Sequence, residues 1–153
     1  MRLLPLHRQG LTHVLVLGGS AGDRLQLARA FHREGGHHAR GFVRLQCGRD
    51  AALLSAALHD FLSAPGAPAS NPICESAGGT LFLDSIADLP PAGQRLLLQL
   101  ALRTPETPAG AWRGRLVIGN DTDLSADVAA GRFLATLYDC LDKLRIELDA
   151  ATA

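Results

Sequence analysis

Lysine is almost absent from this chain of 153 residues: Lys143 is the only one among fifteen basic side chains, and the others are arginines. A phosphate-binding loop built around a lysine is therefore excluded, and lysine-based covalent catalysis is disfavoured. Fifteen acidic residues balance the basic ones. Because no net charge draws the chain to DNA, RNA or an anionic membrane, we expect no direct nucleic-acid partner.

Cysteines are few, and the odd set of Cys47, Cys74 and Cys140 forms neither a CxxC motif nor a disulfide framework. This usage is typical of a reducing cytosol. The six histidines show no HExxH or other metal-binding spacing. No apolar run is long enough to span a membrane, and Met1 to Gly10 lacks the apolar stretch of a signal peptide, so we expect a cytoplasmic protein.

Short apolar runs alternate with leucine- and alanine-rich segments along the chain. We expect strands at residues 12–17, 41–47, 80–83, 115–120 and 143–148, and helices at 23–33, 51–62, 91–102, 125–131 and 133–141. Residues 63–77 are rich in proline and small side chains, which predicts a flexible loop. Strands separated by helices indicate an α/β fold over residues 1–153, a single domain with a parallel sheet between two helical layers.

The strand within Gly78 to Ser85 ends in an aspartate, Asp84. The carboxyl edge of a parallel sheet is where open α/β folds bind ligands, so Asp84 could hold Mg²⁺ beside a phosphate. It could equally cap the next turn or pair with an arginine, and the sequence leaves these two interpretations open. Ser85 cannot act as a general base in the way that a glutamate would.

A second candidate element is the turn after the first strand, at Gly18 to Leu25. A phosphate loop of the form G-x-x-x-x-G-K-[ST] uses glycines, a lysine and a hydroxyl. When the pattern starts at Gly18, Asp23 stands at its second glycine, Arg24 at its lysine and Leu25 at its hydroxyl residue. We favour a strand–loop–helix turn without a ligand over weak nucleotide binding through the remaining N–H groups and Arg24.

Asn120 ends the fourth strand, where it could orient a water molecule near a phosphate. Turn chemistry favours the other interpretation, in which Asn120 starts the turn before Asp121. The complete set of candidate nucleotide-binding residues is Gly18, Gly19, Ser20, Ala21, Gly22, Asp23, Arg24, Leu25, Asp84 and Asn120, with Asp84 as the candidate Mg²⁺ ligand.

These elements resemble, in this order, the AAA+ ATPase domain of bacterial sigma-54-dependent activators, over about Val14 to Leu148. The family strand A-x-G-G-T-L-F-L-D-E is matched from Ala77 to Asp84. The family segment that follows, I-x-D-x-P-x-x-x-Q-x-x-L-L, is matched by Ile86, Asp88, Pro90, Gln94, Leu97 and Leu98. The resemblance implies a three-layer P-loop NTPase-like core.

The departures from the family concern its chemistry. Arg24 replaces the family's lysine and Ser85 its catalytic glutamate, while Leu134 and Cys140 stand where its two inter-subunit arginines fall. Residues 63–77 replace the sigma-contacting loop. The helical lid and the DNA-binding helices of the family have no counterpart in this sequence.

The resemblance therefore implies a module that has lost ATP hydrolysis and works in transcriptional regulation or signalling through protein contacts. Expected partners are an AAA+ activator, a response regulator or another transcription component. We expect no cofactor. The alternative is a residual sensor that binds ATP or ADP weakly with Mg²⁺, and the oligomeric state stays open.

Overall fold

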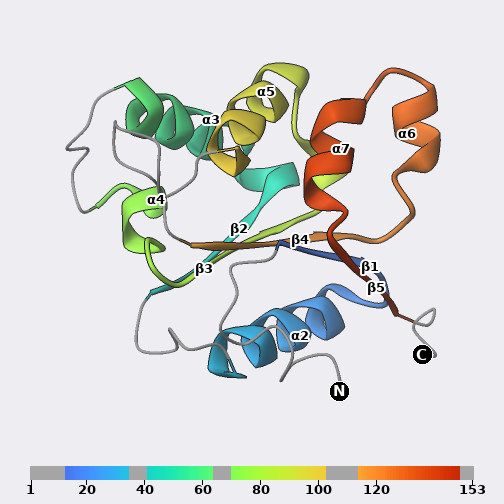
Figure 1. Ribbon diagram of the computed structural model, residues 1–153, viewed down its shortest axis with the longest axis horizontal. Helices are drawn as coiled ribbons and strands as arrows, with labels where there is room; N and C mark the ends of the chain where they lie inside the picture. The colour runs from blue at the N-terminus through green and yellow to red at the C-terminus, as the bar shows by residue number, and fades with distance from the viewer. Residues whose placement is uncertain (1–12, 35–40, 64–69, 103–113, 149–153) are drawn as a thin grey trace.

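The structure is a computed structural model that describes residues 13–34, 41–63, 70–102 and 114–148. Five strands form one sheet in the order β2-β3-β4-β1-β5, and every neighbouring pair is parallel (Figure 1). The strands are β1 Val14–Gly18, β2 Phe42–Gln46, β3 Thr80–Asp84, β4 Arg115–Asn120 and β5 Leu144–Leu148.

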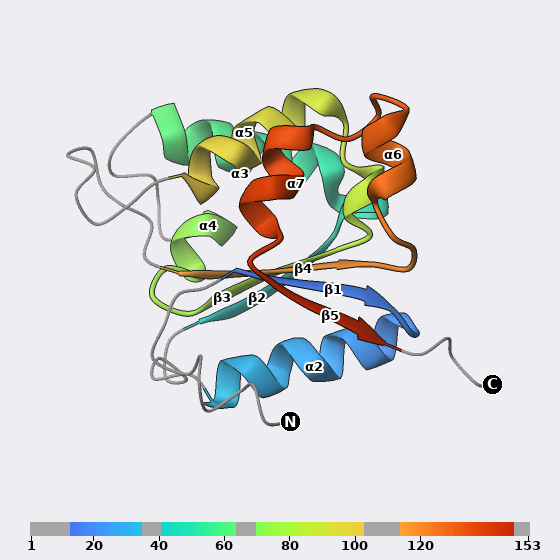
Figure 2. The same cartoon turned by 45° about the vertical axis from the view of Figure 1, so that its right-hand side comes forward.

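Helices cover both faces of this sheet. The described helices are α2 Ala21–Glu34, α3 Cys47–Ser63, α4 Pro72–Glu75, the 3₁₀ turn η1 Ile86–Asp88, α5 Pro91–Ala101, α6 Ser125–Ala129 and α7 Ala135–Leu141. Helix α2 lies on one face, and α3, α5 and α7 lie on the other (Figures 1 and 2). The predicted three-layer α/β/α fold with a parallel sheet is confirmed. None of the described helices has the length and hydropathy needed to cross a bilayer.

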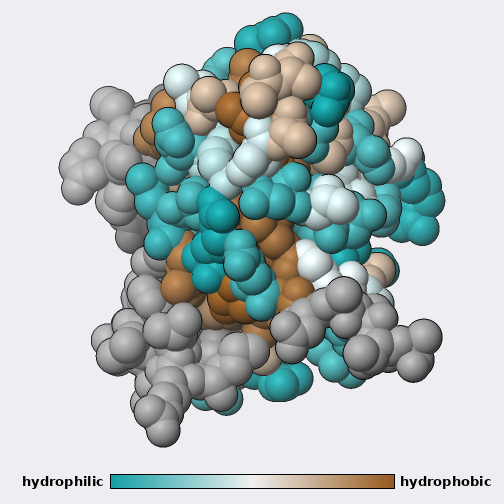
Figure 3. All heavy atoms as spheres, turned by 90° about the vertical axis from the view of Figure 1, so that its right-hand side faces the viewer, coloured by the Kyte–Doolittle hydropathy of each residue, from teal (hydrophilic) through white to brown (hydrophobic). Residues whose placement is uncertain are grey.

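Strands β3 and β4 are buried along their whole length, which explains their continuous apolar sequences. Every residue of β3 and of β4 is buried. At the edge of the sheet, β5 alternates between half-buried and exposed residues. Its half-buried residues are Leu144, Ile146 and Leu148, and Figure 3 shows apolar surface between hydrophilic residues on the side of the molecule where β5 lies.

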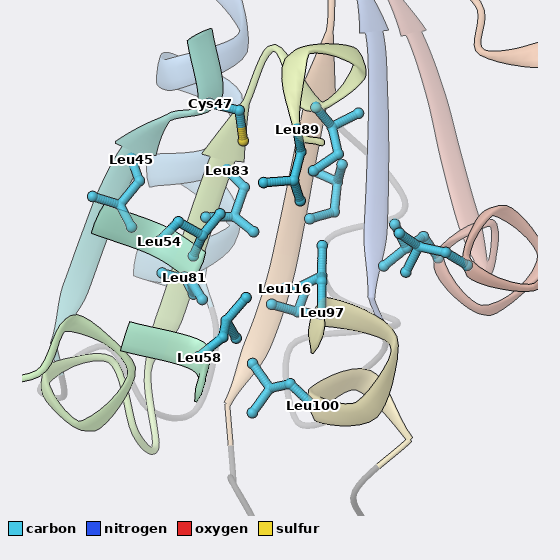
Figure 4. Packing of buried hydrophobic residues seen from close by; sticks show 14 of the residues in the cluster. Leu45, Cys47, Leu54, Leu58, Leu81, Leu83, Leu89, Leu97, Leu100 and Leu116 are labelled. Atoms are coloured by element: carbon cyan, nitrogen blue, oxygen red, sulfur yellow. The ribbon is translucent and has the colours of Figure 1, made fainter. Parts of the chain in front are cut away.

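Two apolar clusters join the layers. The larger packs α3, α5 and α7 against the sheet, with Leu54, Leu83 and Leu97 among its fully buried members (Figure 4). The smaller lies beneath α2 and includes Phe31, Phe82 and Val117, each buried. Because both faces of β1, β3 and β4 are covered, the polar groups at the ends of these strands must find partners within the protein.

The expectation of a flexible loop at 63–77 is wrong for its second half, where residues 72–75 form α4. Asn71 caps this helix: its Oδ1 accepts a hydrogen bond from the Ile73 N–H at 2.8 Å and its Nδ2 donates to the Ala57 carbonyl at 3.0 Å. Proline is well suited to the first helical position, because its missing N–H has no role there. Buried Ile73 then anchors the turn to the core. Residues 64–69 lie outside the described ranges.

Candidate functional site

The candidate residues meet at the carboxyl edge of the sheet. Gly18, Asp84 and Asn120 are the last residues of β1, β3 and β4. Since β4 lies between β3 and β1 in a parallel sheet, the three strand ends are neighbours. The sequence predicted that Asp84 and Asn120 end strands, as they do in the structure, and the contacts that the residues of this edge make define what it can do.

The turn between β1 and α2 is shorter than a phosphate loop. Helix α2 begins at Ala21 instead of the predicted residue 23, so only Gly19 and Ser20 separate it from β1. Gly18 and Gly19 both have positive φ, 86° and 66°, which glycine adopts without strain. A Cβ on Gly18 would also lie 2.5 Å from the Leu148 carbonyl oxygen. The glycines therefore serve the tight turn and its contact with β5.

Ser20 and Asp23 close the start of α2 on itself. The Ser20 N–H donates to the Asp23 carboxylate at 3.0 Å, and the Asp23 N–H donates to the Ser20 hydroxyl oxygen at 3.0 Å. This reciprocal pair is a capping box, with aspartate in the position usually held by glutamate. Hydrogen bonding of the carboxylate to the Ser20 backbone N–H, and to the Ser20 side chain, lowers the pKa of Asp23. Two N–H groups that a phosphate loop would present to an anion are thus already satisfied.

The side chain of Arg24 fills the space between the turn and β3. It is 4% exposed. Its Nε and Nη2 donate to the two carboxylate oxygens of Asp84, at 2.8 Å and 3.3 Å. Its Nη1 donates to the carbonyl oxygens of Gly18 and Gly19, both at 2.9 Å. Of the two interpretations left open for Asp84, pairing with an arginine is the one that the geometry matches.

Gly119 makes this ion pair possible. It lies on β4, between the strand that ends at Gly18 and the strand that ends at Asp84. A Cβ at this position would lie 2.4 Å from Asp84 Oδ1 and 3.3 Å from Arg24 Cδ. The guanidinium and the carboxylate therefore meet directly above a backbone that has no side chain.

This arrangement does not fit a nucleotide phosphate with Mg²⁺. A phosphate loop aims N–H groups at an anion, whereas the Gly18 and Gly19 carbonyl oxygens here point at a cation. The Asp84 carboxylate is fully buried, with both oxygens on the Arg24 guanidinium. Within the described ranges, no group of three His, Cys, Asp or Glu residues is placed to hold a metal ion.

The Asn120 side chain is likewise hydrogen-bonded to other parts of the chain. The Ala87 N–H of η1 donates to Asn120 Oδ1 at 3.1 Å, and Asn120 Nδ2 donates to the Thr122 carbonyl at 3.0 Å. The side chain is 1% exposed. It ties the end of β4 to the segment that follows β3, in agreement with the turn interpretation that the sequence favoured.

Gln46 and Ser85 form a contact that the sequence interpretation missed. Gln46 Nε2 donates to Ser85 Oγ at 2.7 Å, while Gln46 Oε1 accepts from the Gly48 N–H at 2.6 Å. Ser85 has φ 56° and ψ 48°, a left-handed conformation that costs a non-glycine residue about 1–2 kcal/mol. The only available signal was the place of Gln46 at the end of a strand.

Gln94 is a second contact residue whose role the sequence did not reveal. It is 1% exposed. Its Nε2 donates to the carbonyls of Leu89 and Arg132 at 2.8 Å and 2.9 Å, and its Oε1 accepts from the Leu134 N–H at 2.8 Å. It joins α5 to Leu134, the residue immediately before α7. By the resemblance, the family's two arginine positions fall at Leu134 and at Cys140 within α7.

Cys47 adds no nucleophile to this edge. Burial, together with the charges of Asp84, Asp88 and Asp50, raises the pKa of its thiol to about 12. The thiol therefore stays protonated near neutral pH, as expected of a small apolar filler.

The sheet order and the strand–turn–helix at its carboxyl edge define an α/β domain of the P-loop NTPase class. The crystal structure of the P-loop NTPase domain of a sigma-54 transport activator from E. coli matches 96% of this chain and 98% of that chain, with a TM-score of 0.67 and 26% identity. NtrX from Brucella abortus matches 97% of this chain and 36% of its own, with a TM-score of 0.79 and 20% identity.

Within that class, the sigma-54 interaction domain family matches residues 7–147, and the chain belongs to this family. The transcriptional regulatory protein ZraR of Escherichia coli K12 is 32% identical over 145 residues, covering 88% of this chain and 33% of ZraR. The hydrogenase transcriptional regulatory protein HoxA of Bradyrhizobium diazoefficiens is 34% identical over 147 residues, covering 90% and 30%. The chain spans about a third of the length of these curated relatives, and as a sigma-54 interaction domain it belongs to transcription regulation.

Proposed function

We propose that this chain is a sigma-54 interaction domain that does not hydrolyse ATP and acts in transcription regulation through protein contacts. The observation that carries the proposal is the placement of Arg24. Its guanidinium lies between the Asp84 carboxylate and the carbonyls of Gly18 and Gly19, at the edge of the sheet where this class of fold binds ligands.

The residues around this ion pair support the same proposal. Phosphoryl transfer depends on positioning and on positive charge at the transferred group, and an inter-subunit arginine is worth roughly 10³–10⁵ in rate. Here Leu134 and Cys140 stand at the two arginine positions. Ser85 stands at the position of the water-activating glutamate, and its hydroxyl is bonded to Gln46. The glutamate that would activate water and the two arginines that would supply positive charge are thus each replaced by a residue of different chemistry.

Contact with another protein is the role that this combination favours. The polar groups of the edge are bonded within the chain and the core is intact, so the fold is maintained by interactions other than those with a nucleotide. We propose that the partner is an AAA+ activator, a response regulator or another transcription component. This is supported by the regulators among the relatives, which include the response regulator protein PilR of Pseudomonas aeruginosa.

A second candidate function is nucleotide sensing without hydrolysis. NtrX from Brucella abortus, whose structure resembles this chain with TM-scores of 0.74 and 0.76, has been crystallised with ADP and with ATP. If a nucleotide bound here, Gly18 to Gly22 and Asp84 would have to rearrange, since their polar groups face Arg24 and each other.

A titration with fluorescent ATP and ADP analogues, with and without Mg²⁺, separates the two candidates. The wild type is compared with Asp84→Asn, and Asp88→Asn serves as the matched control because Asp88 is an exposed carboxylate four residues away. No binding up to about millimolar nucleotide, or only ~4 kcal/mol of affinity, supports the protein-contact role. Saturable, Mg²⁺-dependent binding that Asp84→Asn removes and Asp88→Asn keeps favours the sensor.

Hydrolysis and partner binding are measured on the same preparation. Release of phosphate from ATP by the wild type, abolished in Asp84→Asn, would contradict the proposal. Co-elution with the AAA+ domain of a sigma-54 activator from the same organism is the expected positive result. If none of the three classes of partner co-elutes with the folded domain, the protein-contact role is wrong.

A further inference from the structure

We propose that the Arg24 guanidinium is an internal cation that closes a divalent-cation site at Asp84, and that it holds this edge of the sheet in one arrangement without any ligand. This inference rests on the proposed function, because it states how the nucleotide site is kept closed. It assigns a role to Arg24, Asp84 and Gly119 together, and it predicts that removing Arg24 makes Asp84 responsive to Mg²⁺.

The negative charge of Asp84 is balanced within the chain by Arg24. The Asp84 side chain is fully buried and the Arg24 side chain is 5% exposed. A buried carboxylate is tolerated only with a positive partner and with hydrogen bonds to its oxygens. Both oxygens receive an N–H from the same guanidinium. A divalent cation would need these oxygens and would also meet the charge of Arg24, so the two cations exclude each other.

The Arg24 guanidinium is also held from a second side, by backbone carbonyl groups. Its Nη1 donates to the carbonyl oxygens of Gly18 and Gly19, which are uncharged oxygen ligands of the kind that hard cations bind. Arg24 is therefore surrounded by two carboxylate and two carbonyl oxygens. This set of oxygens suits a cation, and the side chain of Arg24 supplies one permanently.

The contacts of Arg24 connect the ends of β1 and β3. Gly18 ends β1 and Asp84 ends β3, and these strands are separated by β4. The ion pair crosses β4 at Gly119, where a Cβ would lie 2.4 Å from Asp84 Oδ1. One side chain thus joins the ends of two strands that make no direct pairing with each other.

The segment that follows β3 is held by hydrogen bonds from neighbouring strands. Ser85 is bonded by Gln46 from β2, and the N–H of Ala87 is bonded by Asn120 from β4. Together with the Arg24–Asp84 pair, these contacts hold the start of this segment from two strands, β2 and β4, and from helix α2. We infer that residues 84–89 keep a single position whether or not nucleotide is present, so that a partner meets the same surface in both conditions.

The test is a set of thermal melts with and without millimolar MgCl₂, on the full chain. The variants are Arg24→Gln, which leaves Asp84 unpaired, and the double variant Arg24→Gln with Asp84→Asn, which removes both charges. Arg132→Gln is the matched control, because Arg132 is in an exposed ion pair with Asp127. Hydrogen exchange of residues 84–89 and calorimetric titration with MgCl₂ are recorded for each variant.

We expect Mg²⁺ to leave the Tm of the wild type and of Arg132→Gln unchanged. Arg24→Gln should lower the Tm on the order of 10 °C, since an uncompensated buried carboxylate remains. Mg²⁺ should restore part of this loss and slow the exchange of residues 84–89. The double variant should melt above Arg24→Gln and should not respond to Mg²⁺.

Several outcomes would overturn the inference. A wild type that binds Mg²⁺ alone would show that Arg24 does not close the site, and an Arg24→Gln variant that folds but ignores Mg²⁺ would show that no cation site lies beneath it. If Arg24→Gln does not fold, the double variant decides: recovery of folding supports charge compensation at Asp84, and continued failure refutes it. None of these results depends on ATP hydrolysis, so they can fail while the proposed function holds.

Discussion

The two ends of the central strands are closed by different chemistry. At the carboxyl end, the ion pair of Arg24 and Asp84 is buried between β1 and β3. At the amino end, the Leu116 N–H donates to His13 Nδ1 at 3.3 Å, and His32 Nδ1 lies 3.0 Å from Thr80 Oγ1. One end thus relies on opposite charges, whereas the other includes His13, whose Nδ1 must be unprotonated to accept the Leu116 N–H. The comparison predicts that the ends respond differently to substitution and to pH.

The largest expected effect is that of Gly119→Ala, which breaks the carboxyl end. The new methyl group would lie 2.4 Å from Asp84 Oδ1 and 3.2 Å from the Phe82 ring, so the ion pair must move. We expect a loss of about 3 kcal/mol or more in the free energy of unfolding, measured by urea denaturation.

Gly22→Ala is its matched control. A methyl group there meets nothing closer than Ser20 Oγ at 3.7 Å, and alanine is the better helix former by about 0.5–1 kcal/mol. We expect Gly22→Ala to be as stable as the wild type or more stable. Destabilisation at Gly22, with a tolerant Gly119, would mean that the turn and not the ion pair determines stability at this edge.

Asn120→Ala removes an uncharged contact from the same end of the strands. It leaves the Ala87 N–H without its 3.1 Å acceptor and the Thr122 carbonyl without its donor. A buried polar group left unpaired costs about 1–3 kcal/mol, so we expect a loss of about 2 kcal/mol in chemical denaturation. Thr122→Ala, which removes only a weak 3.4 Å contact, should change stability by less than about 0.5 kcal/mol. Equal effects of the two substitutions would contradict the role assigned to Asn120.

The amino end should be the pH-sensitive one. Burial lowers the pKa of His13 from 6.5, a backbone hydrogen bond with Ala101 opposes this, and the charges of Arg115 and Lys143 lower it further. The unfolded chain therefore takes up the His13 proton first. The contribution of His13 to the free energy of unfolding is therefore fully present above about pH 6.5. It falls as the pH drops below that value, towards the pKa of His13 in the folded state, by at most about 1.4 kcal/mol per pH unit.

Unfolding titrations of the wild type and of His13→Gln measure this slope between neutral and mildly acidic pH. The variant should lose stability less steeply in this range, while its stability at neutral pH serves as the reference. An unchanged slope would show that other groups cause the acid sensitivity.

The smallest expected effect is that of Arg132→Gln, which breaks an ion pair that lies outside both ends. Arg132 Nε lies 3.0 Å from Asp127 Oδ1, as short a distance as many buried contacts, but its side chain is 65% exposed. Exposed pairs contribute about 0.2–1 kcal/mol. We expect a change of about 0.5 kcal/mol in the unfolding free energy, screened by salt. A loss as large as that of Arg24→Gln would mean that burial does not distinguish the two pairs.

The layered fold was predictable because its signals are local. The continuous apolar runs of β3 and β4 reflect strands covered on both faces, and the segments between the strands have helical patterns. The segment at residues 72–75 was missed because composition was given more weight than the Asn71–Pro72 pair, which is a local helix-start signal. The left-handed Ser85 has no such signal, since its conformation is imposed by the residues around it.

The place of the candidate site was predictable, whereas its contacts were not. Strand ends located Asp84 and Asn120, because parallel strands bring their carboxyl ends to one edge. The partner of Asp84 is 60 residues away in sequence, and nothing near either residue specifies that they meet. The requirement for Gly119 follows only from the ion pair above it.

The four hydrogen bonds of Arg24 also limit how this sequence can change. Lysine is the residue that the G-x-x-x-x-G-K-[ST] pattern has at position 24, but its single ammonium group cannot reproduce the planar fork of a guanidinium. It would leave part of the Asp84 carboxylate or the carbonyls of Gly18 and Gly19 without a donor. Replacing Arg24 by lysine alone is therefore expected to give a less stable protein. The identity of residue 24 is thus tied to Asp84 and to the backbone of Gly18 and Gly19, and it cannot change independently of them at no cost in stability.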